Sequence, residues 1–152
     1  MTTLRDRIAR LRESDDPCGA GELVPYMRFL GLSIDRSTGE LLGKLSFADK
    51  VIGNPAVPAI HGGAISALLE NTAVFEVLLS TRIDVLPKTI NVTIDYLRPA
   101  RPRDTWARAT IRREGRRVCT VYAEAWQEDR KRTVATARIQ FLVGGPRTAD
   151  PG

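Results

Sequence analysis

The sequence has few of the residues on which metal and redox chemistry depend. It contains one histidine, His61, and two cysteines, Cys18 and Cys119, which lie too far apart to form a metal-binding or redox motif. A zinc site would lack its ligands, and a structural disulfide is not expected in a reducing compartment. We therefore expect a protein that works without a bound metal and without a cofactor of its own.

A long uninterrupted hydrophobic segment is also absent. The N-terminal residues are charged, and no apolar stretch follows them as it would in a signal peptide. The longest apolar segment, residues 64–79, contains Glu70, Asn71 and Glu76, so it does not predict a membrane span. With 43% hydrophobic and 27% charged residues among 152, the chain has the composition of one globular domain. These observations predict a cytoplasmic protein with no membrane partner.

The positive charge is concentrated in one part of the sequence. The formal net charge is +5, and residues 98–117 hold eight arginines against two acidic residues, Asp104 and Glu114. Such a segment suits a polyanionic partner, either nucleic acid or a phosphorylated cofactor. A solvated arginine-rich surface is a third interpretation. We expect no nucleic-acid partner, because the sequence shows neither a recognition helix nor an aromatic-lined strand motif.

The hydrophobic pattern predicts one long central helix between shorter elements. Helices are expected over residues 2–13 and 21–30, strands over 31–35 and 40–47, a loop over 48–60, and the long helix from about 61 to 81. Four further strands are expected over residues 88–97, 105–113, 117–127 and 132–143. We divide the chain into a helical extension (1–20), a domain (21–143) and a flexible tail (144–152).

The long helix decides the architecture. Because it is apolar on nearly all sides, it must be buried on most of them, and one antiparallel sheet curled around it achieves this in an α+β layout. The first strand after the helix alternates Ile90, Val92, Ile94 and Tyr96 with Thr89, Asn91, Thr93 and Asp95. A sheet of this kind leaves open edges, and pairing with a second copy would cover one of them. We therefore expect a homodimer or a homotetramer.

The start of this helix carries the chemistry. His61, Gly62 and Gly63 open it, and Glu70 follows nine residues after the histidine, among alanines and leucines. Burying a carboxylate within an apolar helix costs free energy, so its presence there indicates a functional role. Open N–H groups at a helix start can donate hydrogen bonds to an incoming oxygen. Together these groups could attack a carbonyl, with Glu70 as base or nucleophile and the amides as an oxyanion site.

Three features together resemble a known family. They are the order of the elements, the segment from Asn54-Pro55 through His61-Gly62-Gly63 to Glu70, and the strand that leads from Thr89 to Arg98-Pro99. These features resemble hotdog-fold acyl-CoA thioesterases of the PaaI-like branch, in the 4-hydroxybenzoyl-CoA thioesterase superfamily. The resemblance covers residues 22–143 and implies a hotdog fold, in which an antiparallel sheet of about six strands wraps around one long helix.

The resemblance also implies roles for individual residues. Glu70 matches the catalytic acid, Gly62 the residue whose N–H polarises the thioester carbonyl, His61 a histidine that shapes the site, and Asn54 an Asn or Gln of the preceding loop. Two departures are visible. Asn54 lies seven residues before His61 where relatives have six, and Val74 stands where some relatives have a hydroxyl.

Further residues are expected to bind the substrate. Helical spacing places small residues beside Glu70, which leaves room for an acyl chain. Arginine forks suit the diphosphate and 3′-phosphate of coenzyme A. The expected substrate-binding residues are Gly63, Ser66, Ala67, Val74, Arg98, Arg101 and Arg116.

The leading hypothesis is hydrolysis of an acyl-CoA thioester to free acid and CoA. A thiolate leaves readily, so one carboxylate and one N–H donor could suffice. The alternatives are a non-catalytic acyl-CoA-binding hotdog protein and a hotdog hydratase or dehydratase. Glu70 argues against a pure binder, and the His-Gly-Gly opening argues against the hydratase type.

Overall fold

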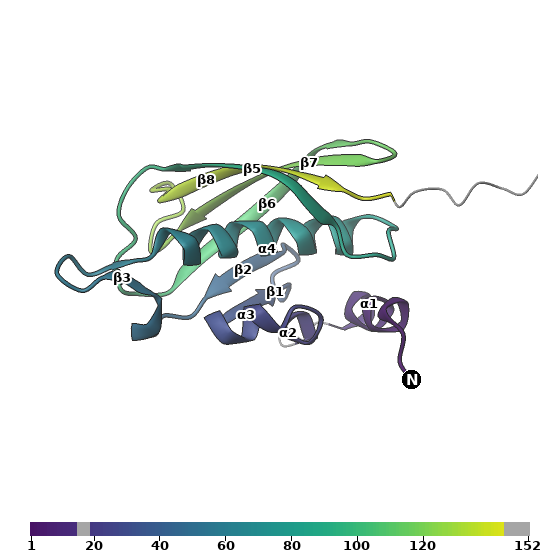
Figure 1. Cartoon of the computed structure of the whole chain (residues 1–152), viewed down its shortest axis with the longest axis horizontal. Helices are drawn as coiled ribbons and strands as arrows, with labels where there is room; N and C mark the ends of the chain where they lie inside the picture. The colour runs from purple at the N-terminus through teal and green to yellow at the C-terminus, as the bar shows by residue number, and fades with distance from the viewer. Residues whose placement is uncertain (15–18, 145–152) are drawn as a thin grey trace, which may run out of the picture.

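The computed structural model describes residues 1–14 and 19–144, and its centre is one long helix inside a curved sheet (Figure 1). The helical elements are α1 (Leu4–Glu13), α2 (Gly19–Leu23), α3 (Pro25–Leu30), the 3₁₀-helix η1 (Asp49–Val51) and α4 (Gly62–Ser80). The strands are β1 (Leu32–Asp35), β2 (Leu42–Leu45), β3 (Ile52–Asn54), β4 (Ala59–Ile60), β5 (Lys88–Tyr96), β6 (Thr105–Glu114), β7 (Val118–Trp126) and β8 (Ala135–Leu142). Cys18 and nearly all of the expected tail lie outside the described residues.

Six of the strands form one antiparallel sheet in the order β1-β2-β6-β7-β8-β5. Strands β1 and β5 are its two edges, and α4 packs against its inner face. This arrangement confirms the α+β hotdog fold expected from the sequence. It also leaves β5, the strand that follows α4 in the chain, as an unpaired edge along the side of the central helix.

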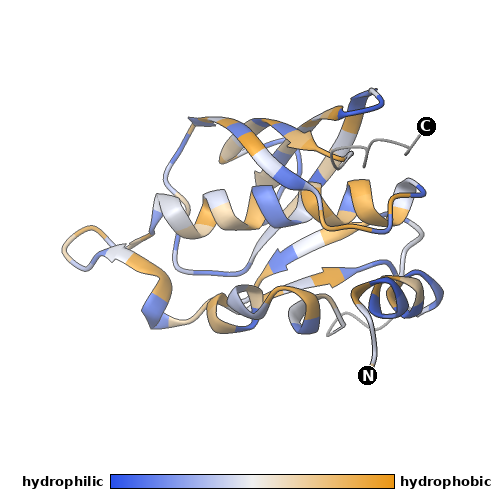
Figure 2. Cartoon of the chain, turned by 45° about the vertical axis from the view of Figure 1, so that its right-hand side comes forward, coloured by the Kyte–Doolittle hydropathy of each residue, from blue (hydrophilic) through white to orange (hydrophobic). Residues whose placement is uncertain are grey.

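Helix α4 is the core of the domain. Its large residues Phe75, Leu68 and Leu78 are fully or almost fully buried. By length and hydropathy α4 would qualify as a membrane span, yet 56% of the relevant window is buried inside the protein, as in a core helix. The helix is largely hydrophobic with a hydrophilic stretch near its middle (Figure 2). That stretch holds Glu70 and Asn71.

Strand β2 crosses α4 at very close range. A Cβ atom built on Gly43 would overlap the Thr72 hydroxyl oxygen and lie 3.2 Å from the Leu68 side chain. Thr72 is completely buried, and its hydroxyl donates a hydrogen bond to the Leu68 carbonyl oxygen at 2.6 Å. Glycine at position 43 therefore sets how closely the sheet packs against the central helix.

The segment before α4 is more ordered than expected. Residues 48–60, predicted as a loop, contain η1 and a hairpin of β3 and β4. The Ile60 N–H bonds the Ala100 carbonyl, and the His61 N–H bonds the Val51 carbonyl, so the chain enters α4 along a fixed path. Smaller differences concern boundaries: the strand expected over 40–47 spans 42–45, the one over 132–143 begins at 135, and the helix over 21–30 is split in two.

Strand β5 departs from the simple alternation predicted for it. A β-bulge interrupts its pairing with β8, because Thr89 pairs with Phe141 and Asn91 pairs with Gln140, which leaves Ile90 without a partner. The extra residue reverses the alternation before it. Ile90, expected on the inner face, is 53% exposed, whereas the Thr89 side chain reaches α4. The prediction was wrong for these two residues, since a bulge leaves no mark on the hydrophobic pattern.

The first helix packs against the same core. Ile8 and Leu11 of α1 are buried, while the rest of that helix is mostly hydrophilic (Figure 2). Thr3 and Asp6 form a capping box at its start. At its end, the Arg12 guanidinium donates hydrogen bonds to three carbonyl oxygens in and just after the last turn of α4, those of Leu78, Thr81 and Ile83.

Candidate active site

The first turn of α4 leaves one backbone amide without an acceptor. His61 is the N-cap, and its Nδ1 accepts a hydrogen bond from the Gly63 N–H at 2.8 Å. The His61 carbonyl oxygen accepts from the Ala64 N–H at 2.9 Å and from the Ile65 N–H at 3.3 Å. Within residues 1–14 and 19–144, the Gly62 N–H has no acceptor. His61 thus provides acceptors for three of the first four backbone N–H groups of the helix, and the remaining one, that of Gly62, stays open.

This open amide lies where a helix favours negative charge. The positive end of the helix dipole stabilises a nearby anion by about 0.3–1 kcal/mol. A carbonyl oxygen that gains charge during an attack could therefore accept from the Gly62 N–H. Because His61 Nδ1 acts as an acceptor, a neutral imidazole here carries its proton on Nε2. His61 Nδ1 is thus engaged in the cap of the helix, and its predicted part in the reaction stays a prediction.

Tyr96 closes one side of this turn. Its hydroxyl lies 2.5 Å from Ser66 Oγ and 3.0 Å from the Gly62 carbonyl oxygen. Ser66 Oγ also donates to the Gly62 carbonyl at 2.9 Å. A Cβ on Gly62 would lie 3.2 Å from the Tyr96 ring, so the tyrosine packs directly against the glycine. The sequence marked Tyr96 only as part of the alternation along its strand and did not include it among the expected site residues. Its position at the end of the strand that follows the long helix was the one available signal.

An apolar cavity of about 400 Å³ opens beside this turn. Gly62, Ile65 and Tyr96 line it, together with residues 97–100. A second, smaller cavity of about 130 Å³ adjoins it, since both are lined by Arg98, Pro99 and Val134. The two cavities are therefore neighbours, the larger one beside the first turn of α4 and the smaller one beside a group of arginines.

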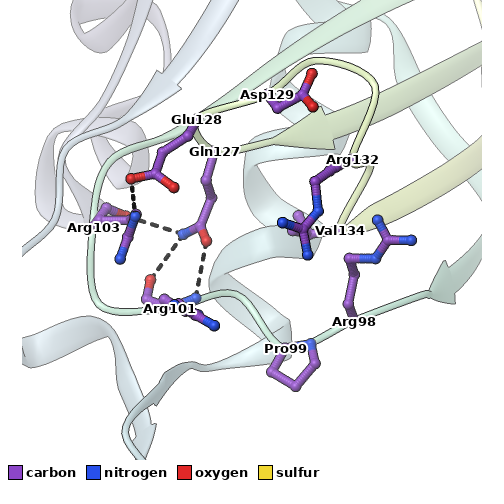
Figure 3. A pocket seen from close by; sticks show the side chains of 9 residues that line it. All are labelled: Arg98, Pro99, Arg101, Arg103, Gln127, Glu128, Asp129, Arg132 and Val134. Atoms are coloured by element: carbon purple, nitrogen blue, oxygen red, sulfur yellow. Dashed lines mark hydrogen bonds and ion pairs between the residues drawn. The ribbon is translucent and has the colours of Figure 1, made fainter.

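The smaller cavity is strongly basic. Arg98, Arg101, Arg103 and Arg132 line it, together with Gln127, Glu128 and Asp129 (Figure 3). Arg103 is paired with Glu128, and Gln127 holds the backbone of Arg101 through bonds of 3.0 and 2.8 Å. Among the residues that the structure describes, the guanidinium groups of Arg98, Arg101 and Arg132 have no hydrogen-bonding partner, since Arg101 bonds Gln127 through its backbone alone. These three cations are available to an anionic ligand.

The structure separates the arginines that are close in sequence. Arg98 and Arg101 share the basic cavity, whereas Arg116 lies in the turn between β6 and β7, at the opposite end of the sheet. Arg108 is paired with Glu124 on the sheet, and Arg112 lies over the Tyr122 ring. The basic segment of the sequence is therefore not one surface, because neighbouring strands carry its members to different ends and faces.

Glu70 lies two turns after Gly62 on α4, and its carboxylate is hydrogen-bonded to a residue of strand β5. Its Oε1 accepts a hydrogen bond of 2.6 Å from the Thr89 hydroxyl of β5, and the side chain is half-buried. The helical rise from Gly62 to Glu70 is about 12 Å. Ser66 lies one turn from each of them, and the Tyr96 hydroxyl covers it. Within one chain, the carboxylate and the free amide are therefore not brought together.

The other expected site residues take simpler positions. Gly63 is exposed, and its amide is used by His61. Ala67 and Val74 are each 8% exposed on α4, on the stripe that also holds Glu70. Asn54 ends β3, and its Oδ1 accepts from the Ala56 N–H at 3.0 Å in a local turn. This oxygen is therefore engaged in a local turn. The predicted catalytic role of Asn54 stays a prediction.

The described part of the chain contains no cluster of three or more potential metal ligands. Cys119 is buried in β7, and burial raises the pKa of its thiol, as expected of a packing residue.

Comparison with known proteins places the chain among thioesterases. Residues 53–142 match the family described as acyl-CoA thioesterase N-terminal domain. The medium/long-chain acyl-CoA thioesterase YigI of Salmonella typhimurium is 29% identical over 136 residues, which cover 80% of this chain and 86% of that protein. YigI of Escherichia coli is 28% identical over the same shares.

Solved structures agree on the fold. A protein from Chromobacterium violaceum has a TM-score of 0.73 and 33% identity, over 92% of this chain and 98% of that one. A phenylacetic acid degradation-related protein from Ralstonia eutropha has a TM-score of 0.72 and 26% identity, over 90% of this chain and 99% of that one. A Bacillus halodurans protein solved with CoA has a TM-score of 0.63 and 21% identity, over 91% of this chain and 84% of that one.

Proposed function

The chain belongs to the family of acyl-CoA thioesterase N-terminal domains, and on that premise we propose that it hydrolyses an acyl-CoA thioester to a free acid and CoA. The observation that carries the proposal is the first turn of α4, where three amides are satisfied and the Gly62 N–H is left for a ligand. The thioester oxygen would accept from this amide, at the positive end of the helix dipole.

Glu70 supplies the second part of the reaction. As a base, its carboxylate would take a proton from water while the water oxygen attacks the thioester carbon. As a nucleophile, it would attack the carbon itself, and water would then release the acid. In both cases the C–S bond breaks, and the CoA thiolate leaves without strong acid catalysis.

The substrate fits the two cavities in sequence. The apolar cavity beside Gly62 suits the uncharged pantetheine arm, and the adjoining basic cavity suits the phosphates of CoA, with Arg98, Arg101 and Arg132 as their partners. This support does not extend to Arg116, which lies at the other end of the sheet. Medium- or long-chain acyl groups are the first candidates, because the YigI relatives act on them.

We further propose that the complete site is formed by two protomers. The Tyr96 hydroxyl over Ser66 and a helical rise of about 12 Å separate Gly62 from Glu70 in one chain, so a carbonyl bound at Gly62 requires the carboxylate of a second copy. Edge strand β5, which carries Thr89 beside Glu70, is unpaired on one side and available for such an association. A homodimer, or a tetramer built from two dimers, would contain complete sites.

The test is a panel of acyl-CoA thioesters from acetyl to palmitoyl, with detection of the released thiol. The native protein is expected to hydrolyse part of the panel, and Glu70→Ala to lower kcat by about 10²–10⁴ at unchanged stability. The same acyl group on pantetheine, which lacks the phosphates, is expected to show a higher KM. Equal turnover by both proteins would remove Glu70 from the mechanism. No turnover by native protein would favour an acyl-CoA-binding role.

A further inference from the structure

The Glu70 carboxylate has one hydrogen-bonding partner in the described part of the chain, and that partner comes from another element. The Thr89 hydroxyl of β5 donates to Oε1 at 2.6 Å, and the bond is partly buried. No described residue bonds the second oxygen, Oε2. The contact therefore fixes one oxygen of the carboxylate and leaves the other for a ligand.

The contact depends on an irregularity of the strand. In a regular β5, Thr89 would share a face with Thr93 and Asp95, which are exposed, and would point away from α4. The bulge at Ile90 adds one residue and turns Thr89 toward the helix, at the cost of exposing an isoleucine. Bulges of this kind occur beside active sites, where they redirect a side chain.

We propose that Thr89, turned inward by the bulge at Ile90, is a positioning residue that holds the Glu70 carboxylate in the orientation used for thioester hydrolysis. The inference rests on the function proposed above for Glu70. An unrestrained glutamate samples several rotamers, and a misplaced catalytic group reacts slowly even at small displacements. A hydroxyl that donates to Oε1 limits this freedom and keeps Oε2 toward the reacting water or carbonyl carbon.

The test compares Thr89→Val with Thr89→Ser. Valine has nearly the same shape as threonine and suits a strand, but it lacks the hydroxyl. Loss of a hydrogen bond to a charged group predicts a decrease in kcat of about tenfold or more for Thr89→Val. KM should change little, and Thr89→Ser should recover most of kcat because it restores the donor. Thr110→Val, the same change at an exposed position of β6, is the matched control and should behave as native.

The Glu70→Ala background separates this proposal from the proposed function. If Thr89 acts through Glu70, adding Thr89→Val to Glu70→Ala changes nothing further, because the group to be positioned is gone. If Glu70→Ala abolishes turnover while Thr89→Val and Thr89→Ser both match native protein, the positioning role is wrong and the thioesterase function stands. If Glu70→Ala is fully active, the proposed function fails, and the positioning role fails with it.

Discussion

The two ends of the central helix differ in how their terminal backbone groups are hydrogen-bonded. At the C-terminal end, Arg12 donates to the Leu78, Thr81 and Ile83 carbonyls, so the end of α4 is closed by a side chain from α1. At the N-terminal end, His61 satisfies its neighbours and leaves the Gly62 N–H open beside an apolar cavity. In the function proposed above, the closed end contributes to stability and the open N–H is left for the substrate.

The largest effect is expected where the open amide is removed. Gly62→Pro deletes this N–H at the first helical position, which accepts proline, and the ψ of 133° at His61 lies outside the helical region, as a residue before proline requires. We expect kcat for acyl-CoA hydrolysis to fall by about 10²–10³, as for loss of an oxyanion donor.

Gly62→Ala is the matched control for that variant. It adds the same Cβ against the Tyr96 ring, 3.2 Å away, and keeps the N–H. Its kcat should therefore exceed that of Gly62→Pro by most of the expected factor. Equal losses in the two variants would attribute the effect to crowding and not to the amide.

A change at the closed end should affect stability instead. Arg12→Ala removes the donor to three carbonyl oxygens, and we expect the free energy of unfolding to fall by about 1.5–3 kcal/mol. Thermal and denaturant unfolding measure this loss, and kcat per folded protein should stay at the native value. Arg10→Ala, an exposed arginine on the same helix, should leave the unfolding free energy nearly unchanged. A lower kcat at native stability in Arg12→Ala would contradict the division between the two ends.

The smallest effect is expected at a contact that touches neither end. Asp104 accepts from the Phe47 N–H at 2.9 Å and lies 3.0 Å from Lys44 Nζ, and these contacts lower the pKa of its carboxyl below 3.8. A lowered folded-state pKa stabilises the fold above pH 3.8, and the contribution is lost as the pH falls through the folded-state value. Because the pair is largely exposed, Asp104→Asn should cost less than about 1 kcal/mol at neutral pH. A stability difference that persists at pH 2 would rule out this origin.

The sequence was sufficient for the fold, and it named two residues around which the candidate site is built. Hydrophobic periodicity predicted α4 nearly to the residue, and the His-Gly-Gly opening followed by a carboxylate nine residues after His61 singled out Gly62 and Glu70. The partners of these residues could not be predicted, because Tyr96 and Thr89 meet α4 through strand position and a bulge that no periodicity records. The arginines illustrate the same limit, since proximity in sequence placed Arg98 and Arg116 together and the sheet places them apart.

Complementation between two inactive variants tests the shared site most directly. In a dimer of one Glu70→Ala and one Gly62→Pro protomer, one site would combine the native Gly62 of the first with the native Glu70 of the second. Co-expression in equal amounts makes about half of the dimers mixed, each with one intact site of two, so about a quarter of native activity should return. Activity that stays at the level of the two separate variants would contradict a site built from two protomers.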